Sequence, residues 1–143
     1  MFKKGPSGMD ACTNNYPQHS HIDDRPPFLP GQITVPRVSV CLLSYNQAEF
    51  LRDSIESVVT QTFTDWELIV IDNGSTDESP ELLRSYEGRP KIRVILHETN
   101  DAPTKRLNEA VAASSGEFVS VLYSDDFYLP AKLQLQVEAF DTL

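Results

Sequence analysis

The chain has 143 residues, with 21 acidic and 12 basic side chains and a formal net charge of -9 at pH 7. Because no run of Lys or Arg is present to displace counterions from phosphates, nucleic acid is excluded as the expected partner. The length allows one compact core. The two cysteines, Cys12 and Cys41, have neither metal-ligand spacing nor a disulfide framework, so we expect reduced thiols.

Residues 1–35 have the composition of a flexible, Pro-rich leader. They hold five of the ten prolines and few aliphatic side chains, too little apolar surface to offset the entropy of ordering. We expect His19 and His21, which lie in this leader, to be solvated rather than metal ligands. No apolar run approaches the roughly 18 residues of a membrane span. Lys3 and Lys4 are followed by Gly-Pro-Ser instead of the apolar region of a signal peptide, so we expect a cytoplasmic protein.

The next segment predicts two buried strands, each followed by a helix. The strands are expected over 38–43 and 67–72, because both are short, continuous apolar runs that end in polar residues. The second helix is expected to be capped by residues 75–77 and to carry Pro80 in its first turn. The apolar stripes of the two helices consist of Leu51, Ile55, Val58, Val59 and Thr62 in the first, and Leu82, Leu83 and Tyr86 in the second.

The pattern repeats in the last part of the chain. A third strand over 91–96 alternates in part, which places it nearer a sheet edge, and a third helix stops at Gly116. A fourth strand is expected over 118–122. A last helix begins after Pro130, with Leu133, Leu135, Val137 and Phe140 as its apolar residues. Four alternations of strand and helix predict an α/β fold, a mostly parallel sheet with helices on both faces.

Three polar clusters follow the first, second and fourth predicted strands. In parallel sheets, ligands bind beyond the carboxyl ends of the strands, so we expect the clusters to meet in one crevice. Neither a Gly-x-Gly-x-x-Gly fingerprint nor a P-loop is present, which indicates a phosphate site built from carboxylates and a divalent metal. The clusters are Ser44-Tyr45-Asn46, Asp72-Asn73-Gly74-Ser75 and Ser124-Asp125-Asp126.

These motifs, in this order and spacing over residues 37 to 140, resemble those of the family-2 glycosyltransferases. The stretches that carry the resemblance are 38–46, 55–63, 66–77, 107–110, 116–118, 124–126 and Pro130. The resemblance implies a GT-A, Rossmann-like fold and a nucleotide-diphosphate sugar as donor, a UDP-sugar as first choice. It also implies Mg²⁺ or Mn²⁺ as the cofactor that bridges the diphosphate.

The resemblance assigns the first two clusters to the nucleotide. Tyr45, with Ser44 and Asn46 beside it, matches a position that lies against the nucleobase, where an aromatic ring can stack. Asp72 and Asn73 match an acidic pair that binds the base and ribose, with an amide in place of the second acid. Two alternatives stay open: Tyr45 packs the loop over the helix, or Asn73 and Gly74 form only a turn and Asp72 is a helix cap.

The resemblance assigns the third cluster to the metal. Asp125 and Asp126 match the last two acids of an Asp-x-Asp-Asp pattern whose first position is Tyr123 here. We expect Asp125 to bind the metal directly, and Asp126 to bind it through water, contact the sugar or cap the turn. Alternatively, 124–126 is only a capped loop. Lys105 or Arg106 is expected near the diphosphate, or else is a plain surface charge.

The resemblance also implies what lies outside these motifs. In the family, the general base and most of the acceptor pocket follow the metal motif, so we expect the base beyond Leu143. Residues 36–143 are then the donor-binding part of a transferase that is truncated after the metal motif and acts on a glycan, lipid or other hydroxyl acceptor. Uncovered apolar surface predicts self-association or a completing C-terminal polypeptide. The alternative is a non-catalytic or degenerate nucleotide-binding or interaction module of the same fold.

Overall fold

The computed structural model describes residues 1–5 and 35–143. Most of the predicted leader, with Cys12, His19 and His21, lies outside the described residues. The first residues of that leader do not match the prediction, because Phe2–Lys3 forms a short strand, β1, which pairs antiparallel with the last strand of the sheet.

The sheet has five strands in the order β1-β5-β2-β3-β4. All pairings among β2, β3, β4 and β5 are parallel, as the sequence predicts. The partly alternating strand, β4, lies at one edge, and all five of its residues are partly exposed. The strands are β2 Val38–Ser44, β3 Trp66–Asp72, β4 Ile92–Leu96 and β5 Phe118–Tyr123.

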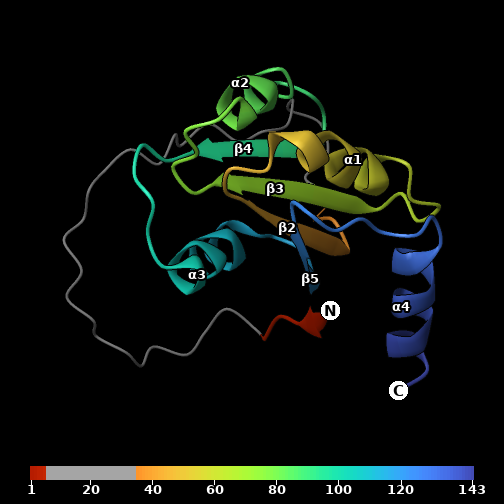
Figure 1. Cartoon of the computed structure of the whole chain (residues 1–143). Coiled ribbons are helices and arrows are strands. Elements are labelled where there is room, and N and C mark those ends of the chain that lie inside the picture. Colours follow the sequence, from red (N-terminus) through yellow and green to blue (C-terminus); the bar gives the residue numbers. More distant parts are fainter. Residues whose placement is uncertain (6–34) are drawn as a thin grey trace, which may run out of the picture.

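Helices cover both faces of the sheet (Figure 1), which confirms the predicted α/β class. On one face, β2 and β3 side chains pack against α1 Ala48–Val59, α2 Ser79–Arg84 and α4 Lys132–Asp141. On the other face, Cys41, Ile69 and Ile71 pack against α3 Pro103–Ala113 through Ala110. Within the described residues, no helix is both long and apolar enough to cross a membrane.

Two helical stripes differ from the prediction. In the first, Val59 is 38% exposed, and Thr62 is exposed and lies beyond the end of α1. In the last, Leu135 is 62% exposed, although all three residues were expected to face the core. In a helix, successive residues are rotated by about 100°, so Val58 and Val59 cannot both face the sheet. Leu135 lies two residues from both Leu133 and Val137, which are buried, and therefore points to the opposite side.

The strand register aligns the carboxyl ends of the three central strands. Ser44 pairs with Asp72, and Leu43 pairs with Tyr123. Beyond the ladder, the Asn73 N–H donates to the Ser44 carbonyl at 2.8 Å, and the Ser124 N–H donates to the Leu43 carbonyl at 3.0 Å. The three polar clusters therefore begin at one level of the sheet, at the same edge.

Candidate functional site

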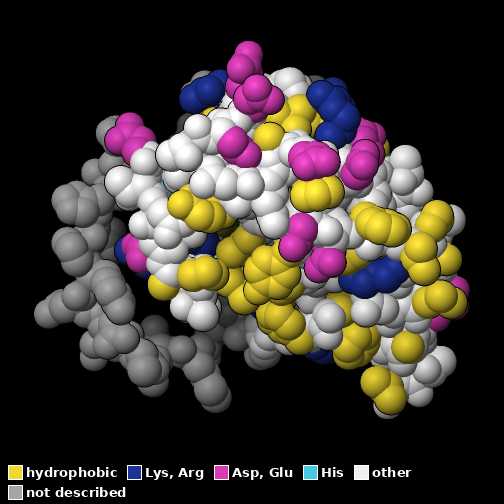
Figure 2. All heavy atoms as spheres, in the orientation of Figure 1, with side chains coloured by type: hydrophobic (Ala, Val, Ile, Leu, Met, Phe, Trp, Pro, Cys, Tyr) yellow, Lys and Arg dark blue, Asp and Glu magenta, His cyan; other side chains and the backbone are white. Residues whose placement is uncertain are grey.

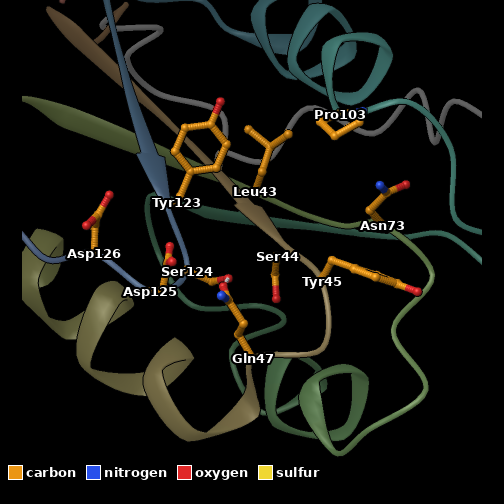
Figure 3. Close-up of a pocket in the computed structure, with 10 residues that line it drawn as sticks. All are labelled: Leu43, Ser44, Tyr45, Gln47, Asn73, Pro103, Tyr123, Ser124, Asp125 and Asp126. Atoms are coloured by element: carbon orange, nitrogen blue, oxygen red, sulfur yellow. Dashed lines mark hydrogen bonds between the residues drawn. The ribbon is translucent and has the colours of Figure 1, made fainter.

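A pocket of about 410 Å³ lies at this edge of the sheet, in the size range of small-molecule sites. The loops that follow β2, β3 and β5 and the start of α3 form its walls (Figure 3). The pocket therefore brings together parts of all three predicted clusters. Its lining residues are Leu43, Ser44, Tyr45, Gln47, Asn73, Pro103, Tyr123, Ser124, Asp125 and Asp126.

The loop after β2 contributes Ser44 and Tyr45 to the pocket, while Asn46 turns away from it. Tyr45 is 46% exposed, so its ring is available to a ligand. Asn46 has a positive φ of 51°. Its Oδ1 accepts the Thr76 N–H at 2.7 Å, and its own N–H donates to Ser75 Oγ at 2.9 Å. Asn46 thus joins the loops after β2 and β3 and does not line the pocket.

Asp72 is fully buried and is also absent from the pocket lining. Its two carboxylate oxygens both accept from Ser75: Oδ2 from the backbone N–H at 2.8 Å and Oδ1 from the hydroxyl at 2.6 Å. The carboxylate shapes the turn after β3 and is not the helix cap of the alternative prediction, because Ser75 precedes the start of α2 at Ser79. The structure therefore places Asp72 beneath the pocket wall, as a support for the residues that form it.

Asn73 lines the pocket and is bonded to the loop before α3. Its Oδ1 accepts the Asp101 N–H at 3.0 Å, and its Nδ2 donates to the Asp101 carbonyl at 2.8 Å. Gly74, the next residue, has a φ of +75°, and a Cβ there would lie 2.4 Å from the backbone carbon of Thr99. Only glycine allows the two loops to approach this closely.

Arg106 is only 6% exposed, so the plain surface-charge alternative is wrong for this residue. Its Nε donates to Asn73 Oδ1 at 2.9 Å and its Nη2 to the Thr99 carbonyl at 3.1 Å. A weaker 3.4 Å contact joins its Nη1 to Glu109. Arg106 supports the pocket wall from behind and does not line the pocket.

Lys105, unlike the adjacent Arg106, is exposed. It pairs with Asp101, and hydrogen bonds from the Lys105 ammonium and the Ala102 N–H lower the pKa of the Asp101 carboxyl. Lys105, one of the two basic residues expected near the diphosphate, thus forms an ion pair with an acid of its own loop.

Asp125 and Asp126 differ from the residues after β2 and β3, because both are exposed and line the pocket. Within residues 1–5 and 35–143, neither carboxylate has a hydrogen-bond or ion-pair partner. Their loop is held by its backbone instead: Ser54 of α1 donates to the Ser124 carbonyl at 2.8 Å and also to the Asp126 carbonyl. The fold thus fixes the loop and leaves both carboxylates available.

Sequence reasoning missed the polar face of α1 that holds this loop. Ser57 Oγ accepts the Tyr128 N–H at 3.0 Å, and Gln61 Nε2 donates to the Leu129 carbonyl at 2.7 Å. Ser54 and Ser57 of α1 and Gln61, which follows the end of α1, have the i, i+3, i+7 spacing of one helix face, which was a readable signal. Gln47 and Pro103 in the pocket lining were also missed, and no motif marks them.

The two exposed carboxylates fit a hard divalent cation. Oxygen is the ligand that Mg²⁺ and Mn²⁺ prefer, and Mg²⁺ is usually bound through one or two carboxylates together with substrate phosphates and water. In the part of the chain that the structure describes, no group of three or more His, Cys, Asp or Glu side chains could hold a metal ion. A metal at Asp125 and Asp126 would therefore depend on ligand oxygens to complete its coordination.

Fold and pocket together define the class of protein. A mostly parallel α/β sheet with a pocket outside the carboxyl ends of its strands is the arrangement of Rossmann-like domains. The family described as Glycosyl transferase family 2 matches residues 39–143. The chain belongs to this glycosyltransferase family, which confirms the resemblance of its motifs.

Curated relatives agree with this assignment. A protein of Nostoc sp., the uncharacterized glycosyltransferase alr2836, is 37% identical over 108 residues, which cover 74% of this chain and 33% of that protein. The uncharacterized glycosyltransferase MJ1057 of Methanocaldococcus jannaschii is 35% identical over 109 residues, or 74% of this chain and 38% of that protein. The matched part of the chain thus spans only 33% to 38% of the length of these relatives.

Solved structures confirm the GT-A fold. TarS 1-349 of S. aureus, in complex with UDP, has a TM-score of 0.68 at 28% identity, covering 74% of this chain and 32% of TarS. The same protein has been solved with UDP-GlcNAc. The mannosyltransferase PcManGT of Pyrobaculum calidifontis, in complex with GDP-Man and Mn²⁺, has a TM-score of 0.61 at 26% identity, covering 72% and 31%.

Proposed function

We propose that this chain binds the donor of a glycosyl transfer, a nucleoside-diphosphate sugar, in the pocket at the strand ends. The observation that carries the proposal is the convergence of Tyr45, Asn73 and Asp125 on one pocket from three different strands. Ligands of the neighbours TarS and PcManGT, namely UDP, UDP-GlcNAc and GDP-Man, support this class of donor. A UDP-sugar is our first choice.

The two sides of the pocket suggest separate roles. Tyr45 offers its exposed ring to the nucleobase, while Asp125 and Asp126 would hold Mg²⁺ or Mn²⁺ on the opposite side. The Mn²⁺ in the PcManGT complex supports a divalent metal. When bound, such an ion supplies positive charge to the diphosphate, which must leave as an anion. Ser44 lines the space between the two sides, and Asn73 lies on the side of Tyr45.

We propose further that the sugar passes to a hydroxyl group of a glycan, lipid or other acceptor. The two pocket aspartates are assigned to the metal, so the general base would come from sequence outside residues 36–143. Phe127, Leu129 and Leu135 are each more than 60% exposed. Figure 2 shows apolar side chains gathered over the centre of this face and toward α4. This surface supports a completing polypeptide or a second copy as partner, and a cytoplasmic location stays a prediction.

A second candidate is a nucleotide-binding module without catalytic turnover. It is favoured by Tyr123, which occupies the first position of the acidic pattern, and by Asp72 and Arg106, which are bonded inside the protein and away from the pocket. Fewer side chains are then left for the donor than the motifs predict.

Calorimetric titration of the chain with UDP and GDP, with and without Mn²⁺, tests the proposal. We expect metal-dependent binding that weakens by at least about tenfold in Asp125→Asn, since a direct metal ligand is lost. Asp53→Asn is the matched control, because it makes the same charge change at an exposed position outside the pocket. A folded sample that binds neither nucleotide under any condition would contradict both candidates.

A further inference from the structure

The side-chain amide of Asn73 has one orientation that satisfies its neighbours. Two N–H donors point at its Oδ1: the Asp101 backbone at 3.0 Å and Arg106 Nε at 2.9 Å. One acceptor, the Asp101 carbonyl, lies 2.8 Å from its Nδ2. A flipped amide would direct its NH₂ group at two N–H donors and its oxygen at a carbonyl. All three hydrogen bonds would then be lost.

This orientation uses all of the acceptor capacity of the side chain. An amide oxygen has two lone pairs, and both are taken by Asp101 and Arg106. An amide nitrogen carries two hydrogens, of which one binds the Asp101 carbonyl. Among the described residues, the second hydrogen has no acceptor. Figure 3 draws the Asn73 nitrogen on the side of the amide that faces Pro103 and the pocket.

The group that fixes this polarity is itself held in place. Arg106 is 6% exposed and also donates to the Thr99 carbonyl at 3.1 Å. A guanidinium group has donors only and stays charged at any ordinary pH, so it cannot adapt to a rotated amide. Asp101 contributes through its backbone, which has no alternative polarity. Arg106 is therefore a positioning residue for Asn73.

We propose that Asn73 determines which nucleobases the pocket accepts, by presenting a single hydrogen-bond donor and no acceptor. This inference rests on the proposed function. Asn73 lies on the same side of the pocket as Tyr45 and across from Asp125 and Asp126 in Figure 3, so it faces the base rather than the diphosphate. The base must then offer a carbonyl oxygen or an unprotonated ring nitrogen at this edge, and an N–H group there finds no partner.

Whether one substitution weakens or strengthens nucleotide binding tests the proposal. Asn73→Asp restores an acidic pair after β3 and replaces the donor with a carboxylate, which only accepts. We expect UDP and GDP to bind at least about tenfold more weakly in the presence of Mg²⁺, whereas inorganic pyrophosphate binds as it does to the unaltered chain. If Asn73 accepted a hydrogen bond from the base, the carboxylate would preserve or strengthen nucleotide binding, and the proposal would be overturned.

Asn108→Asp is the matched control for charge. It makes the same amide-to-acid change on α3, at an exposed residue outside the pocket lining. We expect its affinities for UDP and for pyrophosphate to stay within about twofold of the unaltered chain. An equal loss of UDP affinity in both variants would attribute the effect to charge and would overturn the assignment to Asn73.

A spectroscopic measurement on the unaltered chain keeps the proposal testable if Asn73→Asp does not fold. In ¹⁵N–¹H spectra recorded with Mg²⁺, UDP should shift one of the two Asn73 Nδ2 hydrogens strongly, and Arg106→Gln should reduce that shift. Saturating UDP that leaves both hydrogens unmoved would overturn this inference alone. Absence of any UDP binding would instead reject the proposed function on which it rests.

Discussion

Acidic and amide side chains lie on both sides of the pocket, but they are bonded within the protein on one side and available to a ligand on the other. On the β3 side, Asp72 and Asn73 are bonded to their own loop or to a neighbouring loop. On the β5 side, the Asp125 and Asp126 carboxylates have no such partner in the described part of the chain, because Ser54 holds their loop by its carbonyl groups. A loop that another element holds by its backbone keeps its own side chains available for a ligand.

Asp77, in the loop after β3, is another acid whose carboxylate is bonded within the protein. Its carboxylate accepts the Ala48 N–H at the start of α1, at 3.0 Å, and the Ser79 N–H at the start of α2, at 2.9 Å. Desolvation would raise its pKa, but the hydrogen bonds from Ala48 and Ser79 outweigh that effect and the pKa is lowered. As predicted from the sequence, the carboxylate caps α2, and it also joins the start of α1 to the loop after β3.

Gly74→Ala should cause the largest effect, because the β3 side depends on close packing of two loops. The added Cβ would meet the Thr99 backbone carbon at 2.4 Å and would also occupy a φ of +75°. We expect the free energy of unfolding to fall by about 4 kcal/mol. Urea denaturation followed by circular dichroism measures this change.

Gly88→Ala separates the two causes of that loss. Gly88 has a nearly equal φ of +77°, but a Cβ there would meet nothing within 4 Å. We expect only the cost of the left-handed conformation, about 1 to 2 kcal/mol. Similar losses for the two variants would show that the contact between the loops after β3 and β4 adds little, and the proposed rigidity of the β3 side would be wrong.

A pair of Asp→Asn substitutions should separate the two sides of the pocket directly. Asp72→Asn replaces one of the two oxygens that accept from Ser75, so we expect the free energy of unfolding to fall by about 2 kcal/mol. Asp125→Asn removes no contact within the described residues and should change that free energy by less than about 0.5 kcal/mol. Chemical denaturation of both variants, in the absence of metal, makes the comparison.

The reverse result would break the distinction between the two sides. If Asp125→Asn lowered the free energy of unfolding as much as Asp72→Asn, Asp125 would have a structural partner that the loop geometry does not reveal. The binding data of the same two variants should show the opposite order, with metal-dependent nucleotide affinity reduced mainly in Asp125→Asn.

The sequence predicts four of the five strands, the helices on both faces and the common edge of the polar clusters, because each depends on local patterns. Short apolar runs that end in Ser44, Asp72 and Tyr123 fix where the strands stop. It does not distinguish Asp72 from Asp125, since both follow a strand and only the tertiary contacts differ. The burial of Arg106 was equally unreadable, because its partners Asn73 and Thr99 come from two other loops.

The smallest expected effect concerns a half-buried lysine on the β5 side. Lys132 of α4 donates to Ser120 Oγ, and its Nζ lies 3.4 Å from the centre of the Tyr128 ring. Burial lowers the pKa of Lys132 to about 8, from an ordinary value of 10.5. Between these two values the unfolded chain binds a proton that the folded chain does not, so the free energy of unfolding rises with pH.

We expect this rise to reach about 1 kcal/mol between pH 8 and pH 10, since Lys132 is partly exposed and solvent weakens the effect. Burial raises the pKa of Tyr128 to about 12, so above pH 10 the unfolded tyrosine loses its proton first and the free energy of unfolding falls again.

Lys132→Met should remove the rise of the free energy of unfolding between pH 8 and pH 10. Lys91→Met should retain it, because Lys91 is exposed although it also lies over an aromatic ring, that of Trp66. If the free energy of unfolding still rose with pH in Lys132→Met, other titratable groups would cause the rise. The β5 side would then differ from the β3 side only in its exposed carboxylates.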